Sequence, residues 1–231
     1  MTDESWAGWY RDGNGSDAVV LTTDGQQLRI RIRGVDFEGE SFDRLLPVPD
    51  APPESGMFAL ADGALTDCVL EWDLPLPVLV AGAPRQATLG CLLSLRRADP
   101  DLHLALHLDG AVYESARAES DFAAALTAIQ RTLPDGIRLQ TCIACAFSDY
   151  FPAAGRGLSG TLACFRGAKD AYRGTAGEGA VLDLWDRRTG SVQEVWSCKE
   201  FETRPAEGAG TGHRGAFPQQ PLDSVEPLEP A

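Results

Sequence analysis

The sequence predicts a β-rich α+β fold, in which an antiparallel β domain with one helix is followed by a zinc knuckle built on hairpins. Three observations lead to this prediction. Apolar and polar residues alternate with the period of a strand through much of residues 1–117, and turn residues separate these runs. One later stretch has helical periodicity. Cysteines then recur at the ends of strand-like segments.

Residues 1–117 form the predicted antiparallel β domain. Asp24-Gly25 separates two strand-like runs, which is a strong hairpin signal. In residues 28–33 leucine or isoleucine alternates with arginine, so one face is buried and the arginines are solvated. Pro75 and Pro77 limit the next strand region to an edge or a break. A second long hairpin follows, turning at residues 98–101.

The one convincing helix begins after Ser120, its predicted N-cap, with Asp121 in the first turn. Apolar residues recur at helical spacing as far as Leu133, and Pro134 ends the helix. The residues from Ile137 onward predict a strand that leads into the first cysteine of the later group.

A third hairpin is predicted over residues 180–197, turning at 188–190. Together with the helix it belongs to a second region, residues 118–204, which can pack as one unit with the first. Residues 205–231 hold five prolines and four glycines without periodicity, and they predict a disordered tail.

The composition limits the possible partners. The chain has 20 basic and 34 acidic residues, a net charge of −14, which disfavours nucleic-acid backbones and anionic membranes. A basic protein partner is compatible with this charge. The acidic, polar start is unlike an export signal, and no apolar stretch is long enough to span a bilayer. We therefore expect a cytoplasmic protein in a reducing compartment, where disulfides are disfavoured.

Four of the six cysteines are candidate ligands of one metal ion: Cys142, Cys145, Cys164 and Cys198. The first two form a C-x-x-C pair, whose tight turn can direct both sulfurs to a tetrahedral ion. With no histidine between Cys142 and Cys198, four thiolates would make a closed, structural zinc site and not a catalytic one. Two other interpretations stay open, a thioredoxin-like redox pair and ordinary buried thiols. The latter is our interpretation of Cys68 and Cys91.

Two further patterns give weaker indications of function. The glycine-rich residues 155–160 match G-x-G-x-x-G, but they lead into a strand-like run where a dinucleotide site needs a helix, so we interpret them as a turn. His103 and His107 share one strand face, about 13 Å apart at about 3.3 Å per residue, which is too far for one ion. We interpret both as polar-face residues of a half-buried strand.

Polar residues gather around the cysteines in sequence. They predict either ion pairs or a surface pocket that recognises a partner or a ligand carboxylate. The candidate pocket residues are Asp149, Tyr150, Arg166, Glu194 and Arg204.

Three motifs in this region resemble an uncharacterised bacterial domain family. They are C-x-x-C-x-x-SDY-x-P at residues 142–152, G-x-L-x-CFR-x-x-K-x-x-Y at 160–172, and VQE-x-x-x-C-x-EF-x-x-R at 192–204. The resemblance implies no activity, only that the four cysteines belong together. The amino-terminal β region is loosely similar to immunity-type domains.

Two classes of function follow. The first is a cytoplasmic binding or accessory protein, stabilised by a structural zinc on the four cysteines, that recognises a basic partner; an immunity-type inhibitor would be one case. Residues 1–141, with 22 acidic and 11 basic residues and thus a net charge of −11, suit such a partner. The alternative is an enzyme with a polar cleft beside the knuckle, formed by Asp149, Tyr150, Arg166 and Glu194.

Overall fold

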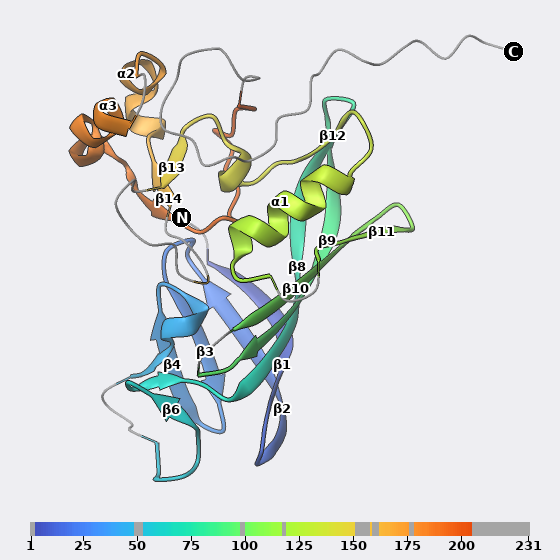
Figure 1. Cartoon of the computed structure of the whole chain (residues 1–231), viewed down its shortest axis with the longest axis vertical. Helices are drawn as coiled ribbons and strands as arrows, with labels where there is room; N and C mark the ends of the chain where they lie inside the picture. Colours follow the sequence, from blue (N-terminus) through green and yellow to red (C-terminus); the bar gives the residue numbers. More distant parts are fainter. Residues whose placement is uncertain are drawn as a thin grey trace, which may run out of the picture.

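A ten-stranded antiparallel sheet dominates the molecule, which confirms the predicted β-rich α+β class. The computed structural model describes residues 3–48, 53–97, 100–116, 119–150, 158, 162–175 and 178–204. Helix α1 (Phe122–Thr132) and a small C-terminal part of the chain lie at the upper end of the sheet in Figure 1. The predicted tail at 205–231 and most of the glycine-rich stretch at 155–160 lie outside the described residues.

The strands follow one another along the sheet in the order β11-β10-β9-β8-β1-β2-β3-β4-β5, and β12 pairs with β8 beside this path. Their bounds are β1 Glu4–Asp12, β2 Gly15–Thr23, β3 Leu28–Ile32, β4 Val35–Gly39, β5 Leu46–Pro47, β8 Cys68–Val80, β9 Ala83–Leu95, β10 Asp101–Leu108, β11 Ala111–Glu114 and β12 Ile137–Leu139. A separate two-stranded ribbon consists of β6 (Leu60–Ala61) and β7 (Ala64–Leu65).

The hairpins predicted for the first region are present. Strands β2 and β3 pair across the turn at Asp24-Gly25, where Gly25 has a φ of +91° that glycine adopts without strain. Strands β9 and β10 pair as the second hairpin. The predicted strand after the helix is β12, which pairs with the far end of β8 and so ties residues 137–139 into the same sheet.

The prediction that Pro75 and Pro77 limit their strand to an edge or a break holds only locally: β8 is not an edge strand, but both prolines lie between the residues that pair with β1 and those that pair with β12. Strand β8 pairs with β9 over its whole length, with both prolines in the ladder. The carbonyl of Pro77 accepts a hydrogen bond from Gln140 on the side away from β9. A strand residue directs its N–H and C=O to the same side, and Pro75, two residues earlier, points the same way as Pro77. The ladder with β9 therefore needs no N–H donor at either proline.

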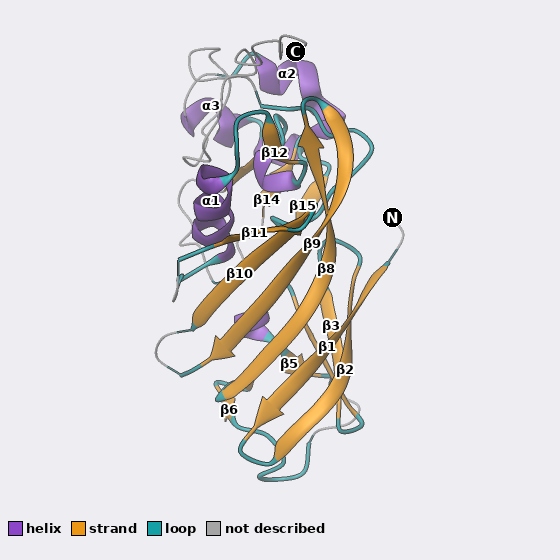
Figure 2. Ribbon diagram, turned by 90° about the vertical axis from the view of Figure 1, so that its right-hand side faces the viewer, coloured by secondary structure: helices purple, strands orange, loops and turns teal. Residues whose placement is uncertain are grey.

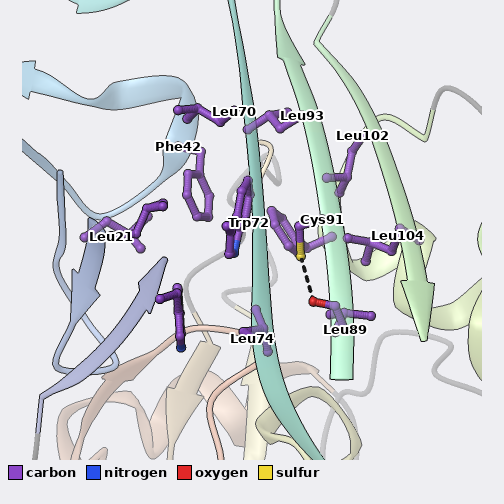
Figure 3. Packing of buried hydrophobic residues seen from close by; sticks show 14 of the residues in the cluster. Leu21, Phe42, Leu70, Trp72, Leu74, Leu89, Cys91, Leu93, Leu102 and Leu104 are labelled. Atoms are coloured by element: carbon purple, nitrogen blue, oxygen red, sulfur yellow. Dashed lines mark hydrogen bonds between the residues drawn. The ribbon is translucent and has the colours of Figure 1, made fainter. Parts of the chain in front are cut away.

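The main core joins the inner face of the sheet to the buried face of α1. Figure 3 shows the part of it around Trp72 of β8. Trp72 of β8 stacks on Phe42 at 4.6 Å between ring centroids, and Phe42 stacks on Phe122 of α1 at 5.6 Å. The helix thus belongs to the sheet's own core. Its N-cap is Asp121, whose carboxylate accepts a bond from the Ala124 N–H, and not Ser120 as predicted, because the helix starts one residue later.

The described residues of 142–204 form a second, smaller unit, here named the C-terminal lobe. Its elements are β13 Ser148–Tyr150, β14 Leu162–Cys164, α2 Lys169–Arg173, α3 Glu178–Asp183 and β15 Gly190–Val192. The third hairpin predicted at 180–197 is therefore wrong, since its first arm is α3. Val181, Leu184 and Trp185 recur at helical spacing and pack on the lobe's own apolar core.

The lobe docks on the Asp24-Gly25 turn of the sheet. The Gln193 N–H donates to the Gly25 carbonyl at 2.8 Å, and the Trp196 ring lies against Gly25. Val192 and Trp196 also belong to the main core, so the two units share apolar packing. Among the described residues no helix is long and apolar enough to cross a membrane.

Candidate functional site

The four candidate cysteines come from separate elements of the lobe. Cys142 and Cys145 lie at the start and just after the end of one short 3₁₀ turn, and the Cys145 N–H donates to the Cys142 carbonyl at 3.1 Å. Cys164 ends β14, the central strand of the lobe's sheet, and Cys198 follows β15. All four thiols are free.

The thiols lie close enough to influence one another's ionisation. Burial raises the pKa of the Cys142 thiol well above its ordinary value, and the other three thiols of the group raise it further, because charge on one disfavours charge on another. Burial likewise raises the pKa of Cys145 and of Cys164, and Cys198 adds to both increases. The lobe therefore brings into one neighbourhood four sulfurs that are distant in sequence.

Backbone N–H groups are directed at two of these sulfurs. Those of Phe147 and Glu202 hydrogen-bond to the sulfur of Cys145 and oppose the rise in its pKa. The N–H of Arg166 does the same for Cys164. A hydrogen bond to the sulfur favours the thiolate, which is the form that binds metal ions. Each of these cysteines has such a donor two residues further along the chain.

Arginine side chains add positive charge beside the same group. The guanidinium of Arg166 acts on both Cys142 and Cys164, and that of Arg204 acts on Cys145, lowering the thiol pKa in each case against the larger effect of burial. Two residues predicted for a ligand pocket thus lie next to the thiols.

The described side chains do not form a metal-binding geometry. Within the described residues, no three or more histidine, cysteine, aspartate or glutamate side chains are grouped so that they could hold a metal ion. A zinc ion needs sulfurs at about 2.3 Å from the metal, which places them roughly 3.8 Å apart. The four described sulfurs influence one another's ionisation, but they are not in such an arrangement.

Arg204 supports the C-x-x-C turn from behind. Its guanidinium donates to the Cys145 carbonyl at 2.9 Å and to the Ser148 carbonyl at 2.9 Å, and the side chain is buried. The Ser148 hydroxyl donates to the carbonyls of Cys142 and Cys145. These bonds fix the backbone that carries two of the four thiols.

Two carboxylates are buried next to this turn, each bonded to a tyrosine. The Tyr172 hydroxyl donates to Asp149 at 2.9 Å, and the Tyr150 hydroxyl donates to Glu194 at 3.0 Å. Asp149 and Glu194 are 2% and 1% exposed, so the tyrosine hydroxyls replace hydrogen bonds that these carboxylates would otherwise make to water.

The predicted pocket residues do not all line one cavity. Asp149, Tyr150 and Arg204 line a cavity of about 380 Å³ between the lobe and the small-residue face of α1. Arg166 lines a different one, of about 490 Å³, beside Lys169 and Glu202. Glu194 lines a third, small cavity on the sheet side, and it hydrogen-bonds to Tyr150 of the first.

Sequence reasoning missed part of the support around the thiols. Neither the role of Ser148 nor that of Glu202 was predicted. The carboxylate of Glu202 pairs with Lys169 at 3.0 Å and with Arg173 at 2.8 Å, while its N–H donates to the Cys145 sulfur. The sequence held one signal for the ion pairs of Glu202: Lys169 and Arg173 are four residues apart, a spacing that places both on one side of a helix.

The remaining candidates behave as interpreted. Cys68 and Cys91 are buried in β8 and β9, where burial raises the pKa of the Cys68 thiol to about 12. The Cys91 thiol donates weakly to the Leu89 carbonyl (Figure 3). His103 and His107 stand on the outer face of β10, away from the apolar side chains that alternate with them.

Comparison with known proteins gives a family but no activity. A family of unknown function, DUF6304, matches residues 4–148. The match includes Cys142 and Cys145 and ends before Cys164 and Cys198. No curated protein and no solved structure matches the chain.

Proposed function

Since the chain belongs to DUF6304, a family of unknown function, we propose its role from its own residues: it is a binding or accessory protein whose C-terminal lobe is held by one structural zinc ion on Cys142, Cys145, Cys164 and Cys198. The observation that carries the proposal is the convergence of four thiols from separate segments, with hydrogen-bond donors directed at two of the sulfurs.

The charge balance of the surroundings supports zinc. Four thiolates and one Zn²⁺ carry a net charge of −2, which needs nearby donors or cations in a buried site. The N–H groups of Phe147, Glu202 and Arg166 and the guanidinium groups of Arg166 and Arg204 supply both. Zinc binding would draw the sulfurs to tetrahedral spacing, and its binding free energy would become folding free energy of the lobe.

A closed site argues for a structural role of the ion. Four cysteine ligands leave no position for a substrate or a water molecule. His103 and His107 lie on the outer face of β10 in the large sheet, outside the lobe that carries the four thiols. The ion would fasten the C-x-x-C turn to β14 and to the segment after β15.

The binding role rests on charge. The net charge of −11 in residues 1–141 suits a basic protein partner, of which the target of an immunity-type inhibitor is one example. Free thiols throughout the described chain are compatible with a reducing, cytoplasmic location.

Metal analysis of the purified chain tests the zinc site. We expect close to one zinc per chain, and loss of the zinc in Cys164→Ser and in Cys198→Ser. Cys68→Ser is the matched control, because Cys68 is buried in β8 outside the thiol group and should keep the metal. A wild-type chain without zinc after expression in zinc-supplemented medium, or variants that keep it, would refute the site.

One observation favours the alternative, an enzyme. The cavity of about 380 Å³ has the buried side chains of Asp149 and Arg204 in its lining, and such pockets are default candidates for ligand sites. Thermal-shift screening with small polar metabolites tests it. A hit that stabilises the wild type but not Asp149→Asn supports the enzyme, and the absence of any hit supports the binding protein.

A further inference from the structure

The outer face of the large sheet carries an exposed apolar patch. Trp9 of β1 is 48% exposed and Val20 of β2 is 53% exposed. The register places Ala18 opposite Trp9 and Ala7 opposite Val20, so only small side chains separate the two large ones. In Figure 2 no described helix lies over the near side of β8, β1 and β2. These four residues are named the Trp9 patch.

The surface around the patch is hollowed. A cavity of about 920 Å³ extends over β1, β2 and β8, and its lining includes the whole Trp9 patch together with Arg31, Glu71 and Asp73. Contiguous exposed apolar surface with a polar rim marks interaction sites in soluble proteins. The volume is large enough for several side chains of a partner.

The charges at the rim do not cancel. Arg31 pairs with Asp36 at 3.3 Å, and Glu71 pairs with Arg11 at 2.7 Å. Asp73 makes no ion pair or hydrogen bond with any described residue. It lies two residues beyond Glu71, which is opposite Trp9 in the register, and on the same face of β8. The Asp73 carboxylate lies against Gly90 of β9, on the side of His107, and it adds one negative charge without an ion pair to the rim of the hollow.

We propose that the Trp9 patch and Asp73 dock a basic segment of a partner protein, in which arginine or lysine alternates with apolar residues. The proposal deepens the binding role proposed above and rests on it. A guanidinium or ammonium group over the Trp9 ring gains a cation–π contact and can reach the Asp73 carboxylate. Apolar side chains of the segment would cover Val20 and the two alanines.

Other occupants are disfavoured by charge. A second copy would bring another chain of net charge −14 against this one and would set one Asp73 near another. An anionic membrane surface repels the same charge. Of these three occupants, the basic segment is the one that both the charge at the rim and the net charge of the chain attract.

The test uses the full chain and a synthetic peptide of about nine residues in which arginine and valine alternate, with a glutamate–valine peptide as counterpart. Calorimetry should show weaker binding of the arginine peptide by about 10-fold or more in Trp9→Ala and by about 5-fold in Asp73→Asn. The matched controls Leu46→Ala and Asp135→Asn, at exposed positions away from the patch, should bind like the wild type. Amide chemical shifts should change mainly in β1, β2 and β8.

Three outcomes would overturn the proposal. The first is that the wild type fails to bind the arginine peptide. The second is that all variants bind it equally, which is what general attraction to an acidic chain predicts. The third is a dimer that Trp9→Ala disrupts, because a second copy would then be the occupant of the patch. Should a variant not fold, the chemical-shift pattern of the wild type still decides. Zinc content, measured on the same samples, separates a failed docking surface from a failed zinc site.

Discussion

Strands β8 and β9 pair along thirteen residues each, whereas every strand of the C-terminal lobe has three. The interiors differ as well. Four charged residues are buried as whole residues in the described chain, Arg138, Asp149, Glu194 and Arg204, and three of them lie in the lobe. The interior under the sheet is almost wholly apolar, whereas the interior of the lobe also contains hydrogen-bonded charged side chains and thiols.

This contrast shows which forces each unit depends on. Among the described residues, seven buried side chains form the lobe's separate apolar core and nine others of the lobe pack into the main core, so without the sheet the lobe has too little apolar interior to offset its chain entropy. Small units without a sufficient core are commonly stabilised by a metal or by disulfides. The sheet needs neither, because long register-matched strands bury continuous apolar surface.

The sharpest test of this contrast is removal of the metal. With a strong chelator, or in Cys198→Ser, we expect the amides of the lobe to lose protection from hydrogen exchange while those of β8 and β9 keep it. The reason is the size of the zinc contribution, about 10 kcal/mol or more in structural sites. Hydrogen-exchange mass spectrometry reports both regions at once.

Chelator added to Cys198→Ser serves as the control, since the variant has no site left to empty. Equal loss of protection in sheet and lobe, or no loss in either, would contradict the separation of the two units.

The next largest effect concerns Arg204. Replacement by methionine keeps most of the apolar stem but removes the guanidinium bonds to the buried Cys145 and Ser148 carbonyls, which then keep the longer bonds from the Ser148 and Tyr172 hydroxyls. We expect a loss of about 4 kcal/mol in the free energy of unfolding. Arg131→Met, at an exposed position on α1, is the control and should change stability by less than about 0.5 kcal/mol. Urea denaturation of both variants decides, and equal effects would show that Arg204 is not a structural support.

Much of the sheet is predictable from sequence, for reasons that do not extend to the lobe. The alternation in residues 28–33 and the Asp24-Gly25 turn specify β2–β3 pairing locally. Even there the pattern fails at Arg33, which leaves the strand with a φ of +50° and turns its side chain to Asp12. Alternation predicts a solvated arginine, and only the fold brings the carboxylate to it.

In the lobe the elements are too short for any period to be read. Helices α2 and α3 have five and six residues, less than two turns each. The spacing of the cysteines predicts that they belong together, but it does not reveal that Ser148 and Arg204 hold the turn between them. Those contacts span up to 59 residues of sequence and depend on tertiary placement.

The joint between the two units gives a smaller but cleaner test. A Cβ at Gly25 would lie 2.7 Å from the Trp196 ring, whereas a Cβ at Gly34 would meet nothing within 4 Å. Both glycines have positive φ, so alanine at either position carries the same kind of backbone strain. We expect Gly25→Ala to be less stable than Gly34→Ala by about 2 kcal/mol, the cost of overpacking at the joint. Thermal unfolding of the pair measures the difference, and equal values would mean that the lobe does not dock firmly.

The smallest effect tests whether the sheet also depends on a charged group. Two hydrogen bonds of 2.8 Å from Arg33 lower the pKa of Asp12 from 3.8 to about 2, and burial only partly opposes this. A carboxylate with a lowered pKa stabilises the fold above pH 4, and this contribution is lost as the pH falls from about 4 to 2.

Asp12→Asn should therefore cost about 1–2 kcal/mol at pH 7, after allowance for the partial exposure of Arg33, and the gap to the wild type should close by pH 2. Denaturant midpoints across this range measure the gap, with Asp36→Asn, which breaks an exposed pair, as the control. A gap that stays constant with pH would show that packing at Asp12, and not its charge, stabilises this end of the sheet.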